Sequence, residues 1–339
     1  MKQKVTLKIL SEILNVSIST VSKSLSDSGD ISVSTKKRVL KMAKHYNYKP
    51  NPMASSLKTN RTRIIGVVIP EIYSHFFAEV LLGIENEVRK QGYQVIIIFS
   101  SNSFKKETNA MDLFLNGFVD GVILSLATET FFKDDFSHLQ SAIDNKLPLV
   151  LFDRTTDKIE CDKIVIDDYE ITVKATNSLI KQGCKNIVFY SNLDKIGVDK
   201  MRIEGYKHSI TTHSNYTNEG VVLSLSDSGT IKTLFSNYLD NNVVDAIIAS
   251  DELASINILN VAKTKGYKIP KDISVIGFTD GLLSINAAPS LTSVNQKAIQ
   301  MGSDSVKTLI NRINNNNAPI TTQTLNAFLT ERESTKKSL

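Results

Sequence analysis

Apolar residues recur at helical spacing over the first 60 residues of the chain. Leu7, Leu10 and Leu14 fall on one helical face, and a serine or threonine precedes each apolar run, where a helix needs an N-cap. The predicted helices cover 7–14 behind Thr6, 18–25 behind Ser17, and a third segment from Ser32 or Ser34 to about Tyr46. Three short helices of this kind predict a small all-α bundle.

The pattern changes at Ile64, where short apolar runs begin to alternate with amphipathic helices. The runs read IIGVVIP, YQVIIIFS, DGVILSL, LPLVLFD, KIVID, NIVFYS, DAIIAS and ISVIGF. Repeated strand–helix–strand units form parallel sheets that helices cover. We therefore predict an α/β core of two doubly wound parallel-sheet lobes, a fold like that of periplasmic binding proteins.

These patterns divide the chain into three parts. We expect a helix-turn-helix headpiece over 1–50, a hinge helix or linker over 51–62, and a core over 63–339. Within the core, lobe one is expected over about 63–164 and 294–320, and lobe two over about 165–293 and 321–334. Parallel-sheet folds bind ligands at the carboxyl ends of their strands, so the cleft between the lobes is the expected ligand site.

Charge is distributed unevenly between these parts. The first 63 residues hold 13 Lys and Arg against 3 Asp and Glu, whereas the whole chain holds 40 against 35. The core therefore carries more acidic than basic residues. Lys and Arg that neutralise phosphates release the counterions condensed on a nucleic acid, so the basic N-terminal part predicts a polyanionic partner.

Cysteine content and motif content argue against several other classes. Cys161 and Cys184 are too few for a disulfide framework or a thiolate zinc site. The chain has no run of 18 apolar residues and no leader pattern, which predicts a cytoplasmic protein with no membrane partner. It also lacks G-x-G-x-x-G after the first strand, G-x-x-x-x-G-K-[ST] and G-x-S-x-G. We therefore expect no enzyme, no catalytic residue, no metal and no cofactor.

The second predicted helix carries the residues suited to reading DNA. Asn15 stands at the tight turn before this helix, and asparagine tolerates the positive φ that such turns use. Lys23 is suited to guanine O6 and N7, and Ile18 to a thymine methyl group. The candidate DNA contacts of the headpiece are Thr6, Ser17, Ile18, Ser19, Thr20, Ser22 and Lys23. The alternative is a three-helix packing module whose polar residues are merely solvated.

The segment YKPNPMASSLKTNRTR predicts a short hinge helix, with Pro52 in its first turn. Two helical turns are marginally stable alone, so this helix needs a second copy or DNA to form. Leu57 is placed to wedge between base steps in the minor groove and kink the duplex. The candidate DNA contacts of the hinge are Asn51, Ala54, Leu57 and Lys58. A flexible linker is the alternative reading of this segment.

With these residues in view, the chain resembles the LacI/GalR family of bacterial transcription regulators along essentially its whole length. The resemblance lies in TLKILSEILNVSISTVSKSL, VSTKKRVLKMAKHYNYKPNPMASSLKT, RTRIIGVVIPEIYSHFFAEVLLGIENEVRKQGYQV, VDGVIL, PLVLFDR, IVIDDYE and DISVIGFTD. It implies a homodimer whose two headpieces bind a pseudo-palindromic operator in double-stranded DNA. It also implies allosteric control by a small effector, a sugar or sugar derivative, bound between the lobes.

The resemblance also implies which core residues face the effector. They are Phe76, Phe77, Asp153, Arg154, Arg202, Asp251 and Thr279. Each has a structural alternative: Phe76 and Arg202 suit a core, and Asp153, Asp167 and Asp251 suit helix caps. The sequence departs from the family at Thr279, where an aspartate is usual and Asp280 is displaced by one position. Ser74 and His75 also replace the usual Asn-Pro, and Ser55 a common basic residue.

Two other functions compete with an effector-controlled repressor. One is a DNA-binding regulator whose core only dimerises, which the loss of a carboxylate at Thr279 keeps open. The other is a solute-binding module without a gene-regulatory role, which the basic headpiece argues against.

Overall fold

The computed structural model describes residues 5–48, 61–193, 197–213, 219–224 and 230–337. The chain forms two compact units, Met1–Thr62 and Arg63–Leu339. We describe each unit by itself. In the part of the chain that the structure describes, no helix is long and apolar enough to cross a membrane.

The first unit is the predicted three-helix headpiece. Its helices are α1 (Leu7–Leu14), α2 (Ile18–Leu25) and α3 (Val33–His45). The side chains of Thr6, Ser17 and Ser32 accept hydrogen bonds from backbone amides one turn into each helix, which confirms the predicted caps and selects Ser32 over Ser34. A small core packs the three helices together around Leu10, Leu14, Val21, Val39 and Ala43.

Asn15 forms the turn between α1 and α2, as its residue type predicts. Its φ of 53° and ψ of 50° lie in the left-handed region, and its backbone amide donates to the carbonyls at the end of α1. The guanidinium of Arg38 on α3 donates to the backbone oxygen of Leu14, beside the turn. The angle between α1 and α2 is therefore fixed from inside the turn and from α3.

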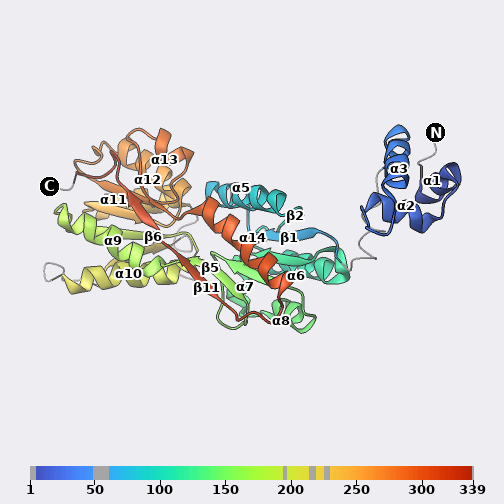
Figure 1. Ribbon diagram of the computed structural model, residues 1–339. Helices are drawn as coiled ribbons and strands as arrows, with labels where there is room; N and C mark the ends of the chain where they lie inside the picture. Colours follow the sequence, from blue (N-terminus) through green and yellow to red (C-terminus); the bar gives the residue numbers. More distant parts are fainter. Residues whose placement is uncertain (1–4, 49–60, 194–196, 214–218, 225–229, 338–339) are drawn as a thin grey trace. The chain divides into compact units, whose positions relative to one another are not determined.

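Lobe one of the second unit is a six-stranded parallel sheet in the order β11-β5-β4-β3-β1-β2. Its strands are β1 (Ile64–Ile69), β2 (Gln94–Phe99), β3 (Gly121–Leu124), β4 (Leu149–Phe152), β5 (Asp162–Ile166) and β11 (Thr322–Leu325). Its helices are α5 (His75–Lys90), α6 (Phe104–Leu113) with the π-helical turn Phe114–Phe118, α7 (Thr128–Lys133), α8 (Ser137–Asp144) and α14 (Ala298–Asn314). Helices α5 and α14 pack on one face of this sheet, and α6 and α8 cover the other (Figure 1).

Lobe two repeats the design with the order β12-β10-β9-β8-β6-β7. Its strands are β6 (Ile187–Ser191), β7 (Val221–Ser224), β8 (Ala246–Ala249), β9 (Ser274–Phe278), β10 (Thr292–Asn295) and β12 (Phe328–Thr330). Its helices are α9 (Asp168–Lys181), α10 (Val198–Thr212), α11 (Ile231–Asn241), α12 (Glu252–Thr264) and α13 (Leu282–Asn286). The predicted fold class, a helical headpiece plus two doubly wound lobes, is confirmed.

The predicted lobe boundary near residue 320 is wrong. We expected 321–334 to belong to lobe two, but β11 (Thr322–Leu325) pairs in parallel with β5 of lobe one. The chain then crosses over, and β12 pairs antiparallel with β10 of lobe two. The run TTQTLNAFLT looks like one strand because the two short strands are separated by only two residues. Three connections therefore join the lobes: β5 to α9, β10 to α14, and β11 to β12.

Helices α5 and α14 of lobe one touch backbone to backbone. A Cβ atom added to Gly302 on α14 would lie 2.1 Å from the carbonyl oxygen of Val80, and one added to Gly83 on α5 would lie 2.0 Å from that of Ile299. Only glycine permits this approach. The pair shares one continuous apolar core with β1 and with α9, α10 and β9 of lobe two.

Candidate functional site

The outer face of α2 presents the predicted reading residues. Ile18 and Ser19 are exposed, Ile18 to 48%, and Thr20 and Ser22 are half-buried. The Ser17 hydroxyl lies 2.8 Å from both the Ser19 and the Thr20 hydroxyls, so three hydroxyl groups gather at the N-terminus of α2. Thr6 is exposed at the start of α1. This face offers both donors and acceptors together with one apolar side chain.

Lys23 is exposed on α2, but its ammonium has a partner inside the headpiece. Its Nζ atom lies 2.9 Å from Oδ2 of Asp30, and this hydrogen bond holds the pKa of Asp30 below its usual value. Lys36 on α3 makes a parallel contact of 2.7 Å with Asp27. The Lys23–Asp30 pair is exposed and so costs little to open, whereas the Lys36 side chain is only 17% exposed. The predicted hinge contacts Asn51, Ala54, Leu57 and Lys58 lie outside the described residues.

A cavity of about 320 Å³ lies between the two lobes of the core. Asp153, Val165 and Thr324 line it from lobe one, and Gly197 and Met201 line it from lobe two. Four carboxylates and no basic side chain appear among its described lining residues. The carboxyl ends of the strands thus form the cleft, where ligands of such folds bind.

Arg202 on α10 is buried next to Met201, which lines this cavity, and protein groups occupy its guanidinium. Its Nε donates to Oδ1 of Asp168 over 2.7 Å, and its NH1 donates to the carbonyl of Ser250 over 3.0 Å. The guanidinium carbon lies 4.0 Å from the ring centre of Phe278. Arg202 is therefore a buried, stacked residue with two donors already in use.

Arg154 is similarly held on the side of lobe one. Its NH1 donates to Oδ1 of Asn102 over 2.8 Å, and its guanidinium lies over the ring of Phe77 at 5.5 Å. Phe76 and Phe77 pack edge to face at 5.2 Å and are only 5% and 2% exposed. Neither ring presents an open face, so their contact with a ligand stays a prediction.

Four aspartates crowd around the two arginines. Burial raises the pKa of Asp153, and it raises that of Asp168 to about 6 despite the nearby charge of Arg202. Burial also raises the pKa of Asp251 to about 6, and the negative charges of Asp199 and Glu71 add to this effect. These mutual effects place Asp153, Arg154, Arg202 and Asp251, all predicted site residues, in one electrostatic cluster.

Two of these aspartates carry a buried oxygen without a hydrogen bond. Asp251 caps α12, with Oδ1 accepting from the Ala254 amide over 2.8 Å, while its Oδ2 has no hydrogen-bond partner among the described residues. Asp199 is fully buried, and its Oδ2 accepts from the Ser191 hydroxyl over 2.8 Å. Its Oδ1 lies 3.6 Å from NH1 of Arg202 but accepts no hydrogen bond within the described chain. Such atoms are costly to bury without a partner.

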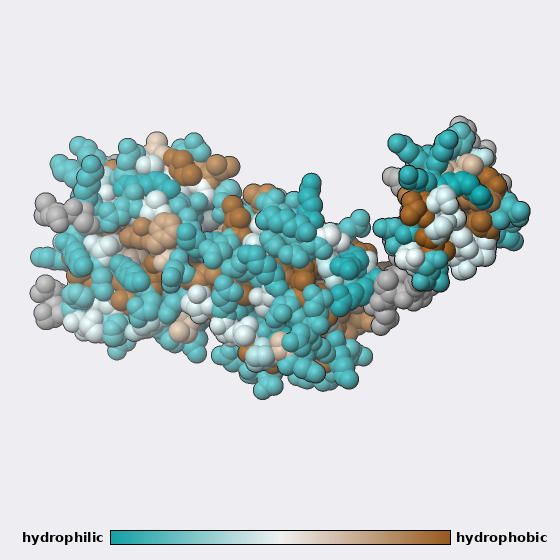
Figure 2. Space-filling view, in the orientation of Figure 1, coloured by the Kyte–Doolittle hydropathy of each residue, from teal (hydrophilic) through white to brown (hydrophobic). Residues whose placement is uncertain are grey.

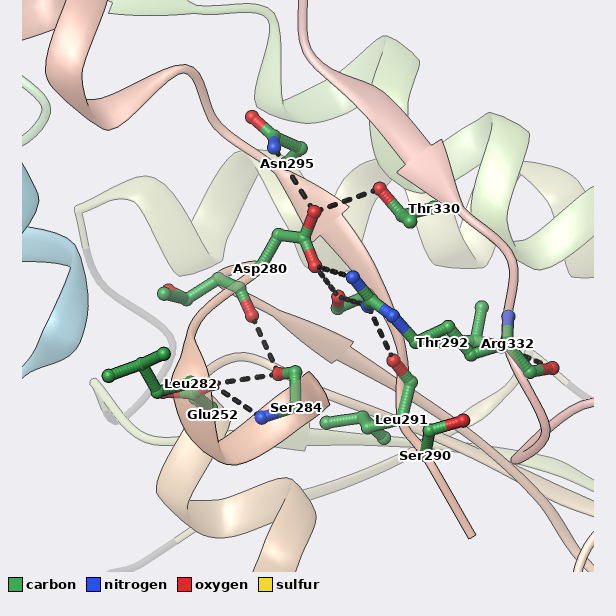
Figure 3. A network of polar contacts seen from close by, with 12 residues as sticks. Glu252, Asp280, Leu282, Ser284, Ser290, Leu291, Thr292, Asn295, Thr330 and Arg332 are labelled. Atoms are coloured by element: carbon green, nitrogen blue, oxygen red, sulfur yellow. Dashed lines mark hydrogen bonds and ion pairs between the residues drawn. The ribbon is translucent and has the colours of Figure 1, made fainter. Parts of the chain in front are cut away.

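The displaced aspartate, Asp280, lies in the loop after β9. Asp280 points toward β10 and β12, where it accepts hydrogen bonds from Ser293, Asn295 and Thr330 and forms an ion pair with Arg332 at 2.5 Å (Figure 3). These contacts tie β12 to β10. Thr279 is buried, and its hydroxyl donates to Oε1 of Gln296 over 3.0 Å.

The backbone of Thr279 is strained. Its φ of 79° is a genuine outlier for a β-branched residue, and strain of this kind persists where the surrounding structure imposes it. The amide of Thr279 donates to the carbonyl of Val294 on β10, which holds the residue in place. Thr279 therefore offers a fixed hydroxyl at the cleft end of β9 in place of a carboxylate.

Sequence reasoning missed Asp168, Asp199 and the Ser250 carbonyl, which position Arg202. Asp168 is the second residue of the DD pair in IVIDDYE, and Asp167 before it caps α9 with a 2.9 Å hydrogen bond from the Glu170 amide. Asp199 stands one helical turn before Arg202, a spacing that signals an ion pair on α10. A search for acids at that spacing would have found it.

Comparison with known proteins gives two family matches. The description "Bacterial regulatory proteins, lacI family" fits residues 12–51, and "Periplasmic binding protein-like domain" fits residues 176–335. The chain is 30% identical over 331 residues to the HTH-type transcriptional regulator RegA of Clostridium saccharobutylicum, covering 94% of this chain and 96% of that protein.

Two solved structures share the fold. A lac repressor dimer bound to operator and the anti-inducer ONPF has a TM-score of 0.85 at 20% identity, covering 98% of this chain and 99% of that one. A complex of the transcriptional regulator CelR with cellobiose has a TM-score of 0.71 at 23% identity, covering 97% and 99%. At these identities the likeness concerns the fold alone.

Proposed function

Because the chain belongs to the LacI family of bacterial regulatory proteins, we propose that it represses target genes from a pseudo-palindromic operator and that a small molecule bound between its lobes controls it. The cluster of buried, partly unsatisfied polar groups at the facing strand ends carries the sensing half of this proposal, because such groups are tolerated where they serve a ligand. The relatives support a sugar or sugar derivative, since CelR binds cellobiose.

Family members are transcriptional regulators, and we propose that this chain is likewise not an enzyme. One of its buried carboxylates, Asp168, accepts a hydrogen bond from Arg202 and so holds a side chain in place. We place it in the cytoplasm because a regulator must reach the chromosome.

We propose that the DNA-binding form is a homodimer, because a two-fold operator needs two headpieces. β2 supports this assembly, because it is an edge strand whose apolar side chains Ile96, Ile97 and Phe99 are each 37–38% exposed. Edge strands of this composition pair with another chain unless they are covered. In lobe two, α13 adds the exposed apolar residues Leu282, Leu283 and Ile285, and Figure 2 shows a brown apolar area over this helix.

The three connections between the lobes allow the cleft to open and close while both sheets stay intact. An effector that fits one lobe arrangement better than the other shifts the population toward it. In a dimer this changes the spacing of the two chains that lead to the headpieces, and thereby the operator affinity.

The decisive test of DNA reading is Lys23→Ala. We expect this change to weaken binding to the operator by about 10- to 100-fold, the effect of losing one specific base contact, and binding to random DNA far less. Fluorescence anisotropy against both DNAs at two salt concentrations measures this. Lys36→Ala is the matched control, because Lys36 is also paired with an aspartate but lies on α3.

Equal losses on operator and random DNA for Lys23→Ala would make Lys23 a phosphate contact only. If the unaltered protein binds operator DNA and random DNA with equal affinity, the operator proposal itself is wrong. Leu57→Ala tests the hinge. A side chain wedged in the minor groove bends DNA, so this change should reduce the bend angle of the operator in the complex, and an unchanged bend angle would contradict the wedge.

A further inference from the structure

The electrostatic cluster beside the cavity holds more negative than positive charge, and its arginines already donate hydrogen bonds to protein groups. Asp153, Asp168, Asp199, Asp251 and Glu71 all act electrostatically on one another or on the two arginines. The arginines donate instead to Asp168 and Ser250, and to Asn102 and Thr128. A phosphate or carboxylate group would therefore meet repulsion and find its natural donors engaged.

The unsatisfied atoms in this cluster are acceptors. Oδ2 of Asp251 and Oδ1 of Asp199 are buried and accept no hydrogen bond from the described residues. They come from different elements, the cap of α12 and the first turn of α10, and the charge of Asp199 contributes to the raised pKa of Asp251. Two buried carboxylate oxygens that lack hydrogen-bond donors, and whose groups act on one another electrostatically, favour a donor with positive charge.

Arg202 supplies positive charge near Asp199, with NH1 3.6 Å from Oδ1, but its hydrogen bonds go to Asp168 and Ser250. The Thr279 hydroxyl donates to Oε1 of Gln296. The Glu252 carboxylate accepts from the amide and the hydroxyl of Ser284 (Figure 3), so these polar groups are satisfied within the chain. On lobe one, Ser125 at the end of β3 has a buried hydroxyl without a partner in the described chain. A hydroxyl both donates and accepts, so it suits a hydroxylated ligand.

We propose that the effector is a polyhydroxylated molecule with a protonated primary amine, of the amino-sugar class, whose ammonium group lies between Asp199 and Asp251. This inference rests on the proposed effector control and narrows the ligand to one chemical class. Asp153 and Asp168 of this cluster line the cavity, so the ring and hydroxyl groups of such a ligand would lie in the cavity. Neutral sugars supply hydroxyl donors but no charge, and sugar phosphates add the wrong charge.

Matched pairs of compounds test the charge directly. The probes are glucosamine with glucose, galactosamine with galactose, and mannosamine with mannose, because each pair differs only at the group on carbon 2. Melting temperature of the full chain and its affinity for operator DNA are measured with each compound at pH 7.5 and at pH 5. We expect one amino sugar to bind at least about tenfold more tightly than its hydroxyl partner, the effect of one charge-assisted hydrogen bond.

The preference should fall at pH 5, because a carboxyl group with a pKa of about 6 is mostly protonated there. Asp251→Asn and Asp199→Asn should each remove most of the preference for the amine. Asp144→Asn is the control, because Asp144 is an exposed residue on α8 outside the cleft. It should leave the preference unchanged.

Two results overturn the inference in distinguishable ways. If neutral sugars or sugar phosphates shift the melting temperature and the DNA affinity while no amino sugar does, the effector control stands and the amine is wrong. If no compound of any of these classes changes either quantity, both the amine and the effector control are wrong, and the core only dimerises.

Discussion

Asp251 combines two demands that conflict. As the N-cap of α12 it must present one oxygen to the helix amides, and this oxygen is satisfied by Ala254. Its other oxygen is buried without a hydrogen bond among the described residues, which destabilises the ionised form. A single aspartate thus stabilises a helix and at the same time stores unfavourable free energy that a positively charged ligand would release.

Asp251→Asn separates these two effects. Asparagine caps equally well, and it has no charge to bury. Burial raises the pKa of Asp251 in the folded protein to about 6 from an ordinary value of 3.8, so the folded protein holds this proton more tightly than the unfolded chain. The carboxylate therefore lowers stability progressively as pH rises from about 4 to above 6, by up to about 3 kcal/mol.

We expect the melting temperature of Asp251→Asn to exceed that of the unaltered protein at pH 7.5 and to match it near pH 4, as measured by calorimetry. Asp167→Asn is the control, because Asp167 also caps a helix but is exposed. A stability gain that is independent of pH would show that charge burial at Asp251 is not the cause.

Residues whose role is local were predictable from sequence, and residues whose role depends on tertiary contacts were not. Thr6, Ser17 and Asn15 act on their own helix ends, so residue type and position sufficed. From its position in the sequence, Asp280 could contact a ligand in the cleft or join neighbouring strands. Its ion pair with Arg332, far along the chain, shows that it joins strands. Asp199 is an intermediate case, because its spacing from Arg202 on α10 could be recognised in the sequence, whereas its hydrogen bond from Ser191 of β6 could not.

Among the elements, α5 and α14 form the tightest contact of lobe one. Their backbones meet at Gly83 and Gly302, and α14 begins directly after the connection from β10 in lobe two. The N-terminus of α5 carries Phe76 and Phe77 beneath Arg154. A change in the spacing of these helices would therefore move both the aromatic residues beneath Arg154 and the connection from β10 to α14.

Gly302→Ala is expected to force the two helices apart, because its new Cβ would overlap the carbonyl oxygen of Val80. Overpacking of this kind costs about 3 kcal/mol, which urea denaturation detects as a lower transition midpoint. Asn311→Ala on the exposed side of α14 is the control and should leave the midpoint nearly unchanged. Equal midpoints for both variants would show that the helices separate without strain.

Short strands mark the limit of sequence patterns at the element scale. The strongly apolar runs of β1, β4 and β9 were recognised because both faces of a parallel sheet are buried. β11 reads TQTL and is mostly exposed, so it has no apolar signal of its own. Its assignment to lobe one comes from the pairing Thr322–Leu325 with Lys163–Ile166, a long-range contact.

On the scale of the whole molecule, the exposed edge at β2 predicts the assembly state. Ile97→Glu places a charge on this edge and should convert the homodimer into a monomer of 37.6 kDa in sedimentation experiments. Operator affinity should fall steeply, because two half-sites are then no longer bound together. Phe132→Glu, at a 60% exposed position on α7, is the control that should stay dimeric. A dimeric Ile97→Glu protein would place the interface elsewhere.

The late position of β11 and β12 along the chain has a consequence for synthesis. Lobe one lacks its outermost strand until Thr322–Leu325 has been made, and lobe two lacks Arg332, the partner of Asp280, until a few residues later. Neither sheet is complete before almost the whole chain exists, whereas the headpiece closes through neighbouring residues alone. A nascent chain therefore folds its DNA-binding headpiece long before the two lobes that bind the effector are complete. Premature termination of synthesis would consequently release molecules that have the DNA-binding headpiece but lack complete effector-binding lobes.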